Sequence, residues 1–590
     1  MACSLLAGFL ALLVPASAEK WHPAKAPLTT RWAADVSPEK ARPEYPRPQF
    51  ARNQWRNLNG LWELGFDDQN NGEKADWTTG HSFPERILVP FTFESSLSGL
   101  GLGTEVHDRL WYRRHFTVPP KWRAGRLLLN FGACDWQTTV WVNGKRVGEH
   151  RGGYTPFTFE ITRALVPGER QELVVSVYDP QTGPQPKGKQ LGSRGIWYTR
   201  TTGIWQTVWL EPVPVTYLKS LVLGPKPEER ALLIDGRVAE PSQDTELKAV
   251  LSLGGHEVAT GVGRVLADGS ATVSLALVDV RQWSPEEPTL YDLKLEVIDG
   301  GHRVDEVTSY CGFRTVGVKR GRMTLNGQPV FLRGVLDQGF WPDGIYTAPT
   351  DEALRYDVEM AKALGFNLAR KHVKVEDPRW YYWCDRLGLL VAQDMPSSHD
   401  LSTPEAREQF LREWSDAMTT VRNHPSVALW IPFNEDWGSP GAFQDRVVTR
   451  TRGLDPTRPI IDNSGGTQRA LTDVMDVHDY SSRLAGHTSA ASERPLWVGE
   501  FGGIGLPVRG HTWTEGWGYQ AALGPRSLLS RYSGLVRQLY QAHGLSGFVY
   551  TQLADVEQEL NGLLTYDRIP KADPATLSSL TNGNPLPPIR

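Results

Sequence analysis

The chain has 590 residues, a formal net charge of −4 and 22 tryptophans. This length is too great for a single hydrophobic core, so several domains are expected. The near-neutral charge balance argues against a nucleic-acid partner. Sugar rings stack their apolar C–H faces on indole rings, so the tryptophan content is compatible with carbohydrate binding, although most of these side chains are expected to fill β-sandwich cores.

The first 18 residues have the pattern of an export signal. Residues 5–14 form a short apolar segment, and the small residues Ala16 and Ala18 follow it. An apolar core before an A-x-A pattern is typical of a secretory signal peptide, and this one is too short to span a bilayer. The alternative is an ordinary buried helix. We predict a signal peptide over 1–18, cleavage near Ala18, a periplasmic or extracellular location, and no membrane association after cleavage.

The cysteines predict neither a disulfide framework nor a metal site. Cys3 would leave with the signal, and Cys134, Cys311 and Cys384 lie far apart without metal-binding spacing. Export permits a disulfide, but an odd count argues against a designed framework. We expect buried free thiols. No carboxylate or histidine cluster has the spacing of a divalent-cation site, so no metal and no cofactor are predicted.

Short strands separated by turns follow an irregular, Pro- and Trp-rich arm over 21–37. Alternating apolar and polar residues recur in runs such as QTTVWVNGKRVGEH, in which Asn143-Gly144 marks a tight hairpin. We predict a jelly-roll-like β-sandwich over 19–213. A boundary at 212–214 leads to a second set of alternating strands, whose length suits an immunoglobulin-like β-sandwich over 214–316.

From Arg314 onward, apolar runs alternate with segments of helical periodicity, which is the pattern of βα units. Helices are predicted at 351–364, with a Thr350 cap, and at 404–421 and 528–542. Strands are predicted at 329–335, 367–372, 389–394, 427–435, 459–463, 474–480, 496–501 and 547–552. About eight such strands predict a C-terminal (β/α)8 TIM barrel over 317–590. An open doubly wound sheet would need a Gly-rich phosphate turn after its first strand, and Arg333-Gly334-Val335 is not one. The fold class is thus multidomain β plus α/β.

Two predicted barrel strands end in a glutamate. The run VALWIPFNE ends in Asn434 and Glu435, and RPLWVGEFGG carries Glu500. Barrel enzymes keep their chemistry at the carboxyl ends of the strands. Retaining cleavage of a glycosidic bond needs two carboxyl groups about 5–5.5 Å apart, one protonated and one ionised. We expect burial and the second carboxylate to raise the pKa of Glu435 and keep it protonated. The alternative is that both glutamates cap helices or form structural ion pairs.

These segments resemble a known family. The W-x-x-x-N-E run ending at Glu435 and the G-E-F-G-G run around Glu500 are similar to the acid/base and nucleophile motifs of glycoside hydrolase family 2, which contains β-galactosidases, β-glucuronidases and β-mannosidases. NGLW at Asn59, YRRHF at Tyr112 and TGIWQTVWLE at Thr202 resemble its sugar-binding domain. The resemblance covers nearly the whole mature chain, and it implies that Glu435 is the acid/base and Glu500 the nucleophile.

Further pocket residues are predicted at other strand ends. The resemblance places Arg370 beneath the nucleophile, His372 on the sugar, and Tyr480 on the nucleophile as a hydrogen-bond donor. It also suggests that Tyr550 replaces the Trp platform of relatives. Asn434 can bond the sugar 2-hydroxyl. The remaining candidates are strand-end or rim residues, each of which has a purely structural alternative: Asp337, Trp341, Asp394, His478 and Glu557.

The sequence departs from well-known members of the family in ways that bear on the substrate. LDQGFWPDG follows the first barrel strand in place of a His-rich segment, and no Asn-x-Lys signature of glucuronidases stands near the barrel end. We predict an exported retaining exo-glycosidase acting by double displacement on terminal β-galactoside-like residues of an oligo- or polysaccharide. An α-L-arabinofuranosidase, a β-D-galactofuranosidase or a β-glucuronidase on the same scaffold is the alternative.

Four questions stay open at this point. A non-catalytic carbohydrate-binding protein would also explain the tryptophans, although it has no need for two strand-end glutamates. A transglycosylase would use the same residues, and homo-oligomerisation is left open. The first sandwich could reach the pocket through 151–154 or through the Gly/Pro/Lys-rich loop 180–195.

Overall fold

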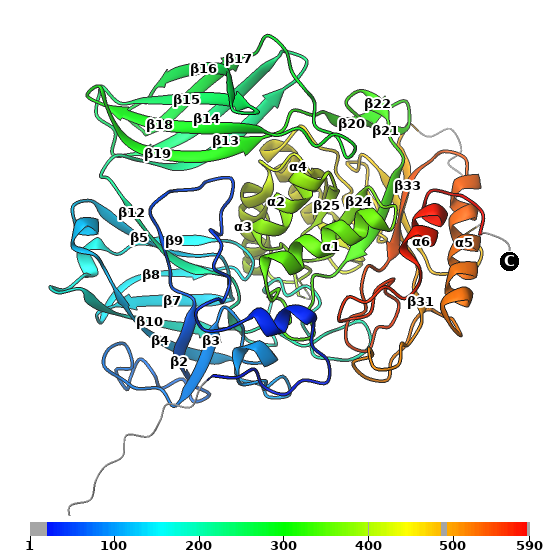
Figure 1. Ribbon diagram of the computed structural model, residues 1–590, viewed down its shortest axis with the longest axis horizontal. Helices are drawn as coiled ribbons and strands as arrows, with labels where there is room; N and C mark the ends of the chain where they lie inside the picture. Colours follow the sequence, from blue (N-terminus) through cyan, green and yellow to red (C-terminus); the bar gives the residue numbers. More distant parts are fainter. Residues whose placement is uncertain (1–20, 399, 485–492, 587–590) are drawn as a thin grey trace, which may run out of the picture.

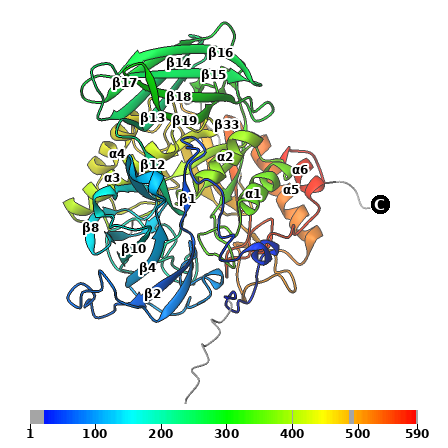
Figure 2. The same cartoon turned by 60° about the vertical axis from the view of Figure 1, so that its left-hand side comes forward.

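The computed structural model describes residues 21–398, 400–484 and 493–586. The predicted signal peptide, 1–18, lies outside the described residues. The three domains pack side by side, with the second β-sandwich at the top of Figure 1, the first β-sandwich below it and the barrel to the right of both (Figures 1 and 2). The fold class is the predicted one, two β-sandwiches followed by a TIM barrel.

The first sandwich packs a four-stranded sheet, β1-β12-β5-β9, on a six-stranded sheet, β3-β2-β4-β10-β7-β8. Its strands alternate buried and partly exposed residues, as in GLWELGF of β2, because successive side chains of a strand point to opposite faces. Asn143-Gly144 forms the predicted turn between β7 and β8. The strands are β1 Arg56–Asn57, β2 Gly60–Phe66, β3 Glu85–Val89, β4 Arg109–Thr117, β5 Arg126–Phe131, β6 Cys134–Asp135, β7 Gln137–Val142, β8 Lys145–Arg151, β9 Phe157–Glu160, β10 Arg170–Tyr178, β11 Gly203–Ile204 and β12 Val208–Val213.

The second sandwich packs the three-stranded sheet β13-β14-β17 on the four-stranded sheet β16-β15-β18-β19. Inward-facing Leu, Val and Ile residues from both sheets form one separate core. The predicted boundary at 213/214 falls between β12 and β13. The strands are β13 Tyr217–Lys226, β14 Ala231–Ala239, β15 Glu246–Leu253, β16 His256–Arg264, β17 Ser270–Ala276, β18 Tyr291–Asp299 and β19 His302–Cys311.

The barrel domain begins with a three-stranded antiparallel sheet, β20 Val316–Lys319, β21 Arg322–Leu325 and β22 Gln328–Pro329. Seven parallel strands then form a curled sheet in the order β26-β25-β24-β23-β33-β30-β29. The fifth barrel strand is short. Its segment β28 pairs in parallel with β27, and an isolated parallel β-bridge joins Trp430 to Ile460. The strands are β23 Leu332–Asp337, β24 Leu368–Lys371, β25 Leu390–Asp394, β26 Val427–Ile431, β27 Phe433–Asn434, β28 Asn463–Ser464, β29 Met475–Asp479, β30 Leu496–Gly502, β31 Ile504–Gly505, β32 Gln520–Ala521 and β33 Leu545–Thr551.

Six helices cover the outside of the barrel strands (Figure 1). The Thr350 hydroxyl caps α1 by accepting the Ala353 N–H, as its position before the helix predicts. The helices are α1 Asp351–Ala363, α2 Pro378–Leu387, α3 Pro404–Val421, α4 Gly441–Leu454, α5 Pro525–Gln541 and α6 Pro574–Thr581, and short 3-10 turns occur at η1 Arg31–Asp35, η2 Ser96–Ser98, η3 Pro120–Arg123 and η4 Thr162–Ala164. Within the described ranges, no helix is long and apolar enough to cross a membrane.

The N-terminal arm and the first sandwich share the barrel's core. Trp32 of the arm and Tyr198 and Trp205 of the first sandwich belong to the same buried cluster as the barrel side chains. Thr30 donates from both its amide and its hydroxyl to Asp343 Oδ2, at 2.7 and 2.6 Å. The loops of the first sandwich are therefore fixed against the carboxyl ends of the barrel strands, which is where the chemistry of a barrel is expected.

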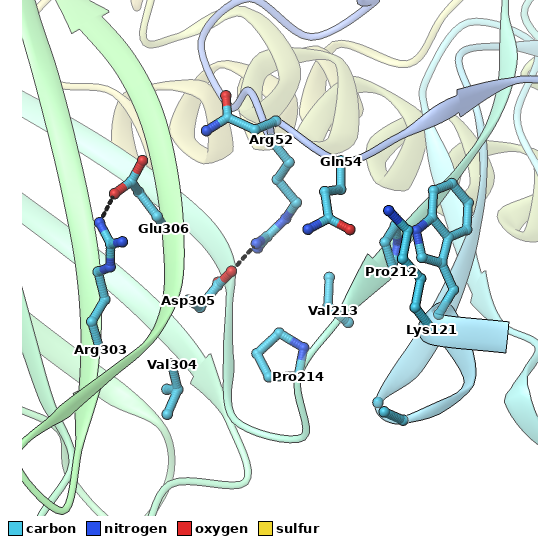
Figure 3. Close-up of a pocket in the computed structure, with 14 residues that line it drawn as sticks. Arg52, Gln54, Lys121, Pro212, Val213, Pro214, Arg303, Val304, Asp305 and Glu306 are labelled. Carbon is cyan, nitrogen blue, oxygen red and sulfur yellow. Dashed lines mark hydrogen bonds and ion pairs between the residues drawn. The ribbon is translucent and has the colours of Figure 1, made fainter. Parts of the chain in front are cut away.

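A hollow of about 520 Å³ lies between the two sandwiches, beside the linker 212–214. Figure 3 shows that Arg52 pairs with Asp305 and that Arg303 pairs with Glu306 in its wall. Arg52 also donates to the Leu218 carbonyl at 2.7 Å. Arg52 therefore ties the segment before β1 to the second sandwich, whereas Arg303 and Glu306 pair within β19.

The thiols agree with the sequence prediction. Cys134, Cys311 and Cys384 are buried and free. Burial raises the pKa of each of these thiols above its ordinary value. They therefore behave as small apolar side chains of the cores.

Candidate active site

Glu435 directly follows β27 and has a left-handed backbone conformation, with φ at 47°. Non-glycine residues rarely adopt this conformation, and such strain concentrates at functional sites. The Glu435 N–H donates to the Ser464 carbonyl of the neighbouring strand β28 at 2.8 Å, which fixes the turn. The side chain is 34% exposed. The strand end therefore holds a rigid backbone while the carboxyl stays open to solvent.

Glu500 lies within β30 and is buried, with the glycine before it packed against a carboxylate. A Cβ at Gly499 would lie 2.3 Å from Asp476 Oδ1, so only glycine fits there. One carboxylate oxygen from each of Glu435 and Glu500 and one ring nitrogen of His478 all lie within 4.8 Å of one another. This spacing is close to the about 5–5.5 Å of retaining glycosidases and well below the roughly 6.5–9.5 Å of inverting ones.

The surroundings of Glu500 favour its ionised form. Arg370 Nη1 lies 3.3 Å from one oxygen, and the Tyr480 hydroxyl donates to the other. Burial by itself would raise the pKa of Glu500, but the charges of His478, His372 and Arg370 lower it below its ordinary value. An ionised carboxylate held by such donors is a nucleophile.

Glu435 differs from the sequence expectation. His478 Nδ1 lies 2.7 Å from Glu435 Oε1. Burial would raise the pKa of this carboxyl, but the hydrogen bond and charge of His478 lower it below its ordinary value. The expected raised pKa of Glu435 is therefore wrong for the unliganded protein, because an imidazole lies between the two carboxylates and offsets their repulsion.

Arg370 forms the floor of the site and is fully buried. Its guanidinium makes three contacts of 3.0–3.1 Å with Asp394, which is also fully buried. Its Nη2 donates to Asn434 Oδ1 at 2.7 Å, which leaves the Asn434 amide free to donate. His372 Nδ1 lies 3.1 Å from Asp394 Oδ2 and 4.0 Å from Glu500. The strand ends thus bring eight of the predicted residues into one cluster: Arg370, His372, Asp394, Asn434, Glu435, His478, Tyr480 and Glu500.

Four predicted pocket residues have other contacts. Asp337 pairs with buried Lys371 at 2.7 Å. Trp341 is 1% exposed, with a guanidinium 3.9 Å over its ring, so it offers no face for sugar stacking. Tyr550 is fully buried beneath Gly502, and its hydroxyl accepts from the Ile504 N–H. Glu557 accepts the Thr199 N–H at 3.0 Å and fastens the first sandwich to the barrel.

The first sandwich does reach the site, through its loop 180–195. Lys187 N–H donates to the Ser397 carbonyl at 2.8 Å, beyond β25, and Gln558 donates back to Gly195 at 2.8 Å, beyond β33. The loop thus spans one side of the barrel mouth. A hollow of about 330 Å³ beside Glu435 is lined by residues of this loop and of the barrel: Gly188, Lys189, Ile196, Trp197, Ser397, Ser398, Leu401, Phe410, Pro432, Phe433, Asn434, Glu435, Asp436, Trp437 and Gly438.

Sequence reasoning missed Lys189, Trp197, Trp437 and Tyr519. Tyr519 stacks on Tyr480 with ring centroids 3.6 Å apart and is 43% exposed. Trp437 lies two residues after Glu435 and is 66% exposed. Its position next to the N-E motif was the sequence signal that could have identified it as a pocket residue. Lys189 lies on a loop that the sequence only indicated as a region. Trp197, Trp437 and Tyr519 form an aromatic rim beside the carboxylate pair, and the Lys189 ammonium lies over the Trp197 ring.

Glu435, His478 and Glu500 are also the one group of His, Cys, Asp and Glu side chains among the described residues with spacing compatible with a metal. A fixed guanidinium stands 3.3 Å from Glu500. That positive charge opposes a second cation at the same place. The expectation that no metal or cofactor is used stays a prediction.

Sequence comparison assigns all three domains to one family. Residues 55–214 match the description "Glycosyl hydrolases family 2, sugar binding domain", residues 230–314 match "Glycosyl hydrolases family 2", and residues 316–494 match "Glycosyl hydrolases family 2, TIM barrel domain". The chain belongs to glycosyl hydrolase family 2. As a family 2 member it is a glycosidase. The barrel match ends before Glu500, so the assignment does not depend on that residue.

Similar family 2 proteins carry two activities in their names. A β-glucuronidase of Paenibacillus borealis is 26% identical over 70% of this chain and 74% of its own length. A putative β-glucuronidase of Formosa agariphila is 29% identical over 70% of this chain, and a β-galactosidase of Thermoanaerobacter pseudethanolicus is 25% identical over 77%. The aligned region spans only 40% and 62% of those two relatives.

A solved structure has the same fold. The crystal structure of Ruminococcus gnavus β-glucuronidase superposes with a TM-score of 0.75 and covers 92% of this chain and 100% of its own. Its sequence identity is 20%, so this likeness concerns the fold alone. Within that family 2 fold, the strand-end cluster brings carboxyl oxygens of Glu435 and Glu500 within 4.8 Å of each other, close to glycosidase spacing.

Proposed function

We propose that the protein is a retaining exo-glycosidase that works by double displacement. The observation that carries this proposal is the spacing of at most 4.8 Å between oxygens of Glu435 and Glu500. Glu500, ionised and held by Arg370 and Tyr480, attacks the anomeric carbon. Glu435, the more exposed carboxyl, protonates the leaving oxygen and then activates water for the second step. Loop 180–195 walls one side of the mouth, which favours attack at chain ends.

The mechanism is tested by replacing each carboxyl. Glu500→Gln removes the nucleophile and is expected to reduce turnover of nitrophenyl glycosides by about 10⁴-fold or more, since covalent catalysis is lost. Glu435→Gln is expected to slow substrates with poor leaving groups far more than dinitrophenyl glycosides, because only poor leaving groups need a proton. Full activity of Glu500→Gln, or accumulation of inverted product by proton NMR, would exclude the retaining mechanism.

Two substrate classes are supported by different observations. A β-galactoside-like neutral sugar agrees with a floor on which Arg370 is already compensated by Asp394. A β-glucuronide or another acidic glycoside agrees with Lys189, which lines the hollow beside Glu435 with its ammonium 5.3 Å from the centroid of the Trp197 ring. The charge of Lys189 acts on Glu435, His372 and Glu559, so it faces the mouth of the site. The named relatives include both activities.

The substrate is tested with a panel of nitrophenyl β-galactoside, β-glucuronide and furanosides. If the acidic class is correct, Lys189→Met lowers kcat/KM on the uronide by about 10–100-fold, since a charge-assisted hydrogen bond contributes about 1.5–3 kcal/mol. The exposed Lys145 of β8 gives the matched control, Lys145→Met. A preference for the neutral galactoside that Lys189→Met leaves unchanged would support the neutral class instead.

Export is part of the same proposal. It is supported by the apolar segment at 5–14 and the A-x-A pattern ending at Ala18. Mass spectrometry of the secreted or periplasmic protein is expected to find an N-terminus at Glu19. Recovery of an uncleaved chain from the cytoplasm alone would contradict this part of the proposal.

A further inference from the structure

A chain of four side chains runs from Glu435 into the barrel wall. His478 Nδ1 lies 2.7 Å from Glu435 Oε1, and its Nε2 lies 2.9 Å from the Ser464 hydroxyl. That hydroxyl donates to Asp476 Oδ2 at 2.5 Å. Asp476 Oδ1 accepts the Gly499 N–H at 2.7 Å. The chain therefore starts at the proposed acid/base and ends beside the residue that precedes the proposed nucleophile.

The directions of these hydrogen bonds fix one proton of the imidazole. Burial raises the pKa of Asp476, against the charges of His478 and Arg370, but in its ionised form both carboxylate oxygens can only accept, so the Ser464 proton is then committed to Asp476. The Ser464 oxygen can then only accept from His478, which requires a proton on Nε2. One position remains undetermined, the proton in the 2.7 Å contact between Nδ1 and Glu435. That proton can belong to either partner without any other change in the chain.

Local packing holds the imidazole in this position. A Cβ at Gly465, whose φ is 66°, would lie 2.3 Å from His478 Nδ1, so the backbone closes directly over the ring. The side chain of His478 is only 6% exposed. Arg370 Nη1 lies 3.4 Å from Nε2, and because a guanidinium can only donate, this contact is not a hydrogen bond when Nε2 carries its proton. The ring is therefore a fixed partner of Glu435, with little freedom to act as a mobile substrate ligand.

The charges around His478 come from every strand end that surrounds it. Burial lowers its pKa, but the neighbouring carboxylates raise it above the ordinary value, while Arg370 opposes them. The titratable and charged groups that interact with it lie on β24, β25, β29, β30 and the end of β27: Arg370, His372, Asp394, Asp476, Glu500 and Glu435. Carboxylates outnumber cations in this set, which favours retention of the proton that Glu435 and His478 share.

We propose that His478 is a positioning residue that holds the catalytic proton together with Glu435, and that Ser464 and Asp476 fix the tautomer in which this is possible. The proposal rests on the double-displacement function above. In the first step Glu500 forms a bond to the anomeric carbon as the glycosidic bond breaks, the electrons of the broken bond go to the leaving oxygen, and that oxygen takes the shared proton through Glu435. In the second step water forms a bond to the anomeric carbon, the bond to Glu500 breaks with its electrons returning to that carboxylate, and the water gives one proton back to the Glu435–His478 pair. No other reactant is required.

This arrangement changes which group controls the alkaline limb of the pH profile. In most carboxylate pairs the acid keeps its proton because the second carboxylate repels its ionised form. Here the imidazole lies 3.6 Å from Glu500 and 2.7 Å from Glu435, so it offsets that repulsion. The pair then loses the shared proton at the raised pKa of His478, above that of an isolated glutamic acid, and the imidazole keeps its Nε2 proton.

The test is the pH dependence of kcat/KM for His478→Gln, which keeps a donor side chain that does not titrate. On an alkyl glycoside, kcat/KM is expected to fall by about 10–100-fold, within the range of general acid catalysis. The alkaline limb is expected to move to lower pH by about one unit or more. A dinitrophenyl glycoside needs no proton on its leaving oxygen, so kcat/KM of the variant on that substrate is expected to stay close to the wild-type value.

The control is His511→Gln, because His511 forms an equivalent 2.7 Å contact with Asp567 outside the cluster. A second variant, Ser464→Ala, removes the hydroxyl that accepts from His478 Nε2. We expect it to move the alkaline limb to lower pH by a smaller amount than His478→Gln does. Equal losses on both substrates with an unmoved limb, in either variant, would overturn the proposal. If the wild type hydrolyses no glycoside, or if Glu500→Gln is fully active, the proposed function fails. If the wild type is an active glycosidase but the alkaline limb is unmoved in the His478 and Ser464 variants, only the proposed role of His478 is refuted.

Discussion

Replacing Arg370 with methionine is expected to destabilise the barrel through Asp394. The two side chains are fully buried and share three contacts of 3.0–3.1 Å. Without the guanidinium, Asp394 keeps only His372 and the Val373 N–H as partners. Removing one partner of a buried pair costs about 3–5 kcal/mol. At about 2–4 °C per kcal/mol for a domain of roughly this size, the thermal midpoint of the barrel should fall by about 6–20 °C.

The loss should depend on pH in a defined direction. Burial already raises the pKa of Asp394, and removal of Arg370 raises it further. A carboxyl with a higher pKa in the folded than in the unfolded state stabilises the fold below its unfolded pKa, and this contribution disappears as the pH rises through the folded pKa. The difference in midpoint between wild type and Arg370→Met should therefore be larger at pH 8 than at pH 5.

Differential scanning calorimetry at the two pH values is the assay. The double variant Arg370→Met with Asp394→Asn carries no charge at either position, so its deficit relative to wild type should vary less with pH. The nucleophile complicates the comparison little, because Glu500 keeps Tyr480 and His478 as partners. A midpoint difference that is equal at both pH values, or a total loss below about 1 kcal/mol, would refute the reasoning about an uncompensated buried charge.

Two further predictions concern Glu500. Tyr480→Phe removes a hydrogen-bond donor to the ionised Glu500 carboxylate. We expect kcat/KM to fall by about 10–100-fold and the acid limb of its pH profile to move to higher pH. An acid limb that does not move would contradict this role of Tyr480. Gly499→Ala places a Cβ against Asp476 and should both lower the thermal midpoint and reduce activity by about 100-fold, because a shift of about 1 Å in the nucleophile is enough for such a loss. Gly453→Ala in α4 is its control, since an added Cβ there meets no atom within 4 Å, and equal effects of both alanines would refute the packing argument.

The sequence by itself determined the order and class of the domains. Strand-length apolar runs ending in polar residues predicted the barrel strands, and observed strands such as Leu390–Asp394 and Val427–Ile431 fall within those runs. This works because a parallel strand that is buried on both faces must be apolar along its length. The same logic located Glu435 and Glu500 at strand ends, since parallel strands direct their carboxyl ends to one side of the sheet.

Only the tertiary structure decided what each strand-end side chain touches. Trp341 and Tyr550 have the residue types of sugar platforms, but segments distant in sequence cover them: the arm with Trp32, and the strand end at Gly502. Lys189 reaches the mouth because the first sandwich shares the barrel's core. The pKa of Glu435 is lowered where the sequence led us to expect a raised one, for the same reason: a pKa depends on which charges the fold brings within a few ångströms, and His478 comes from a different strand.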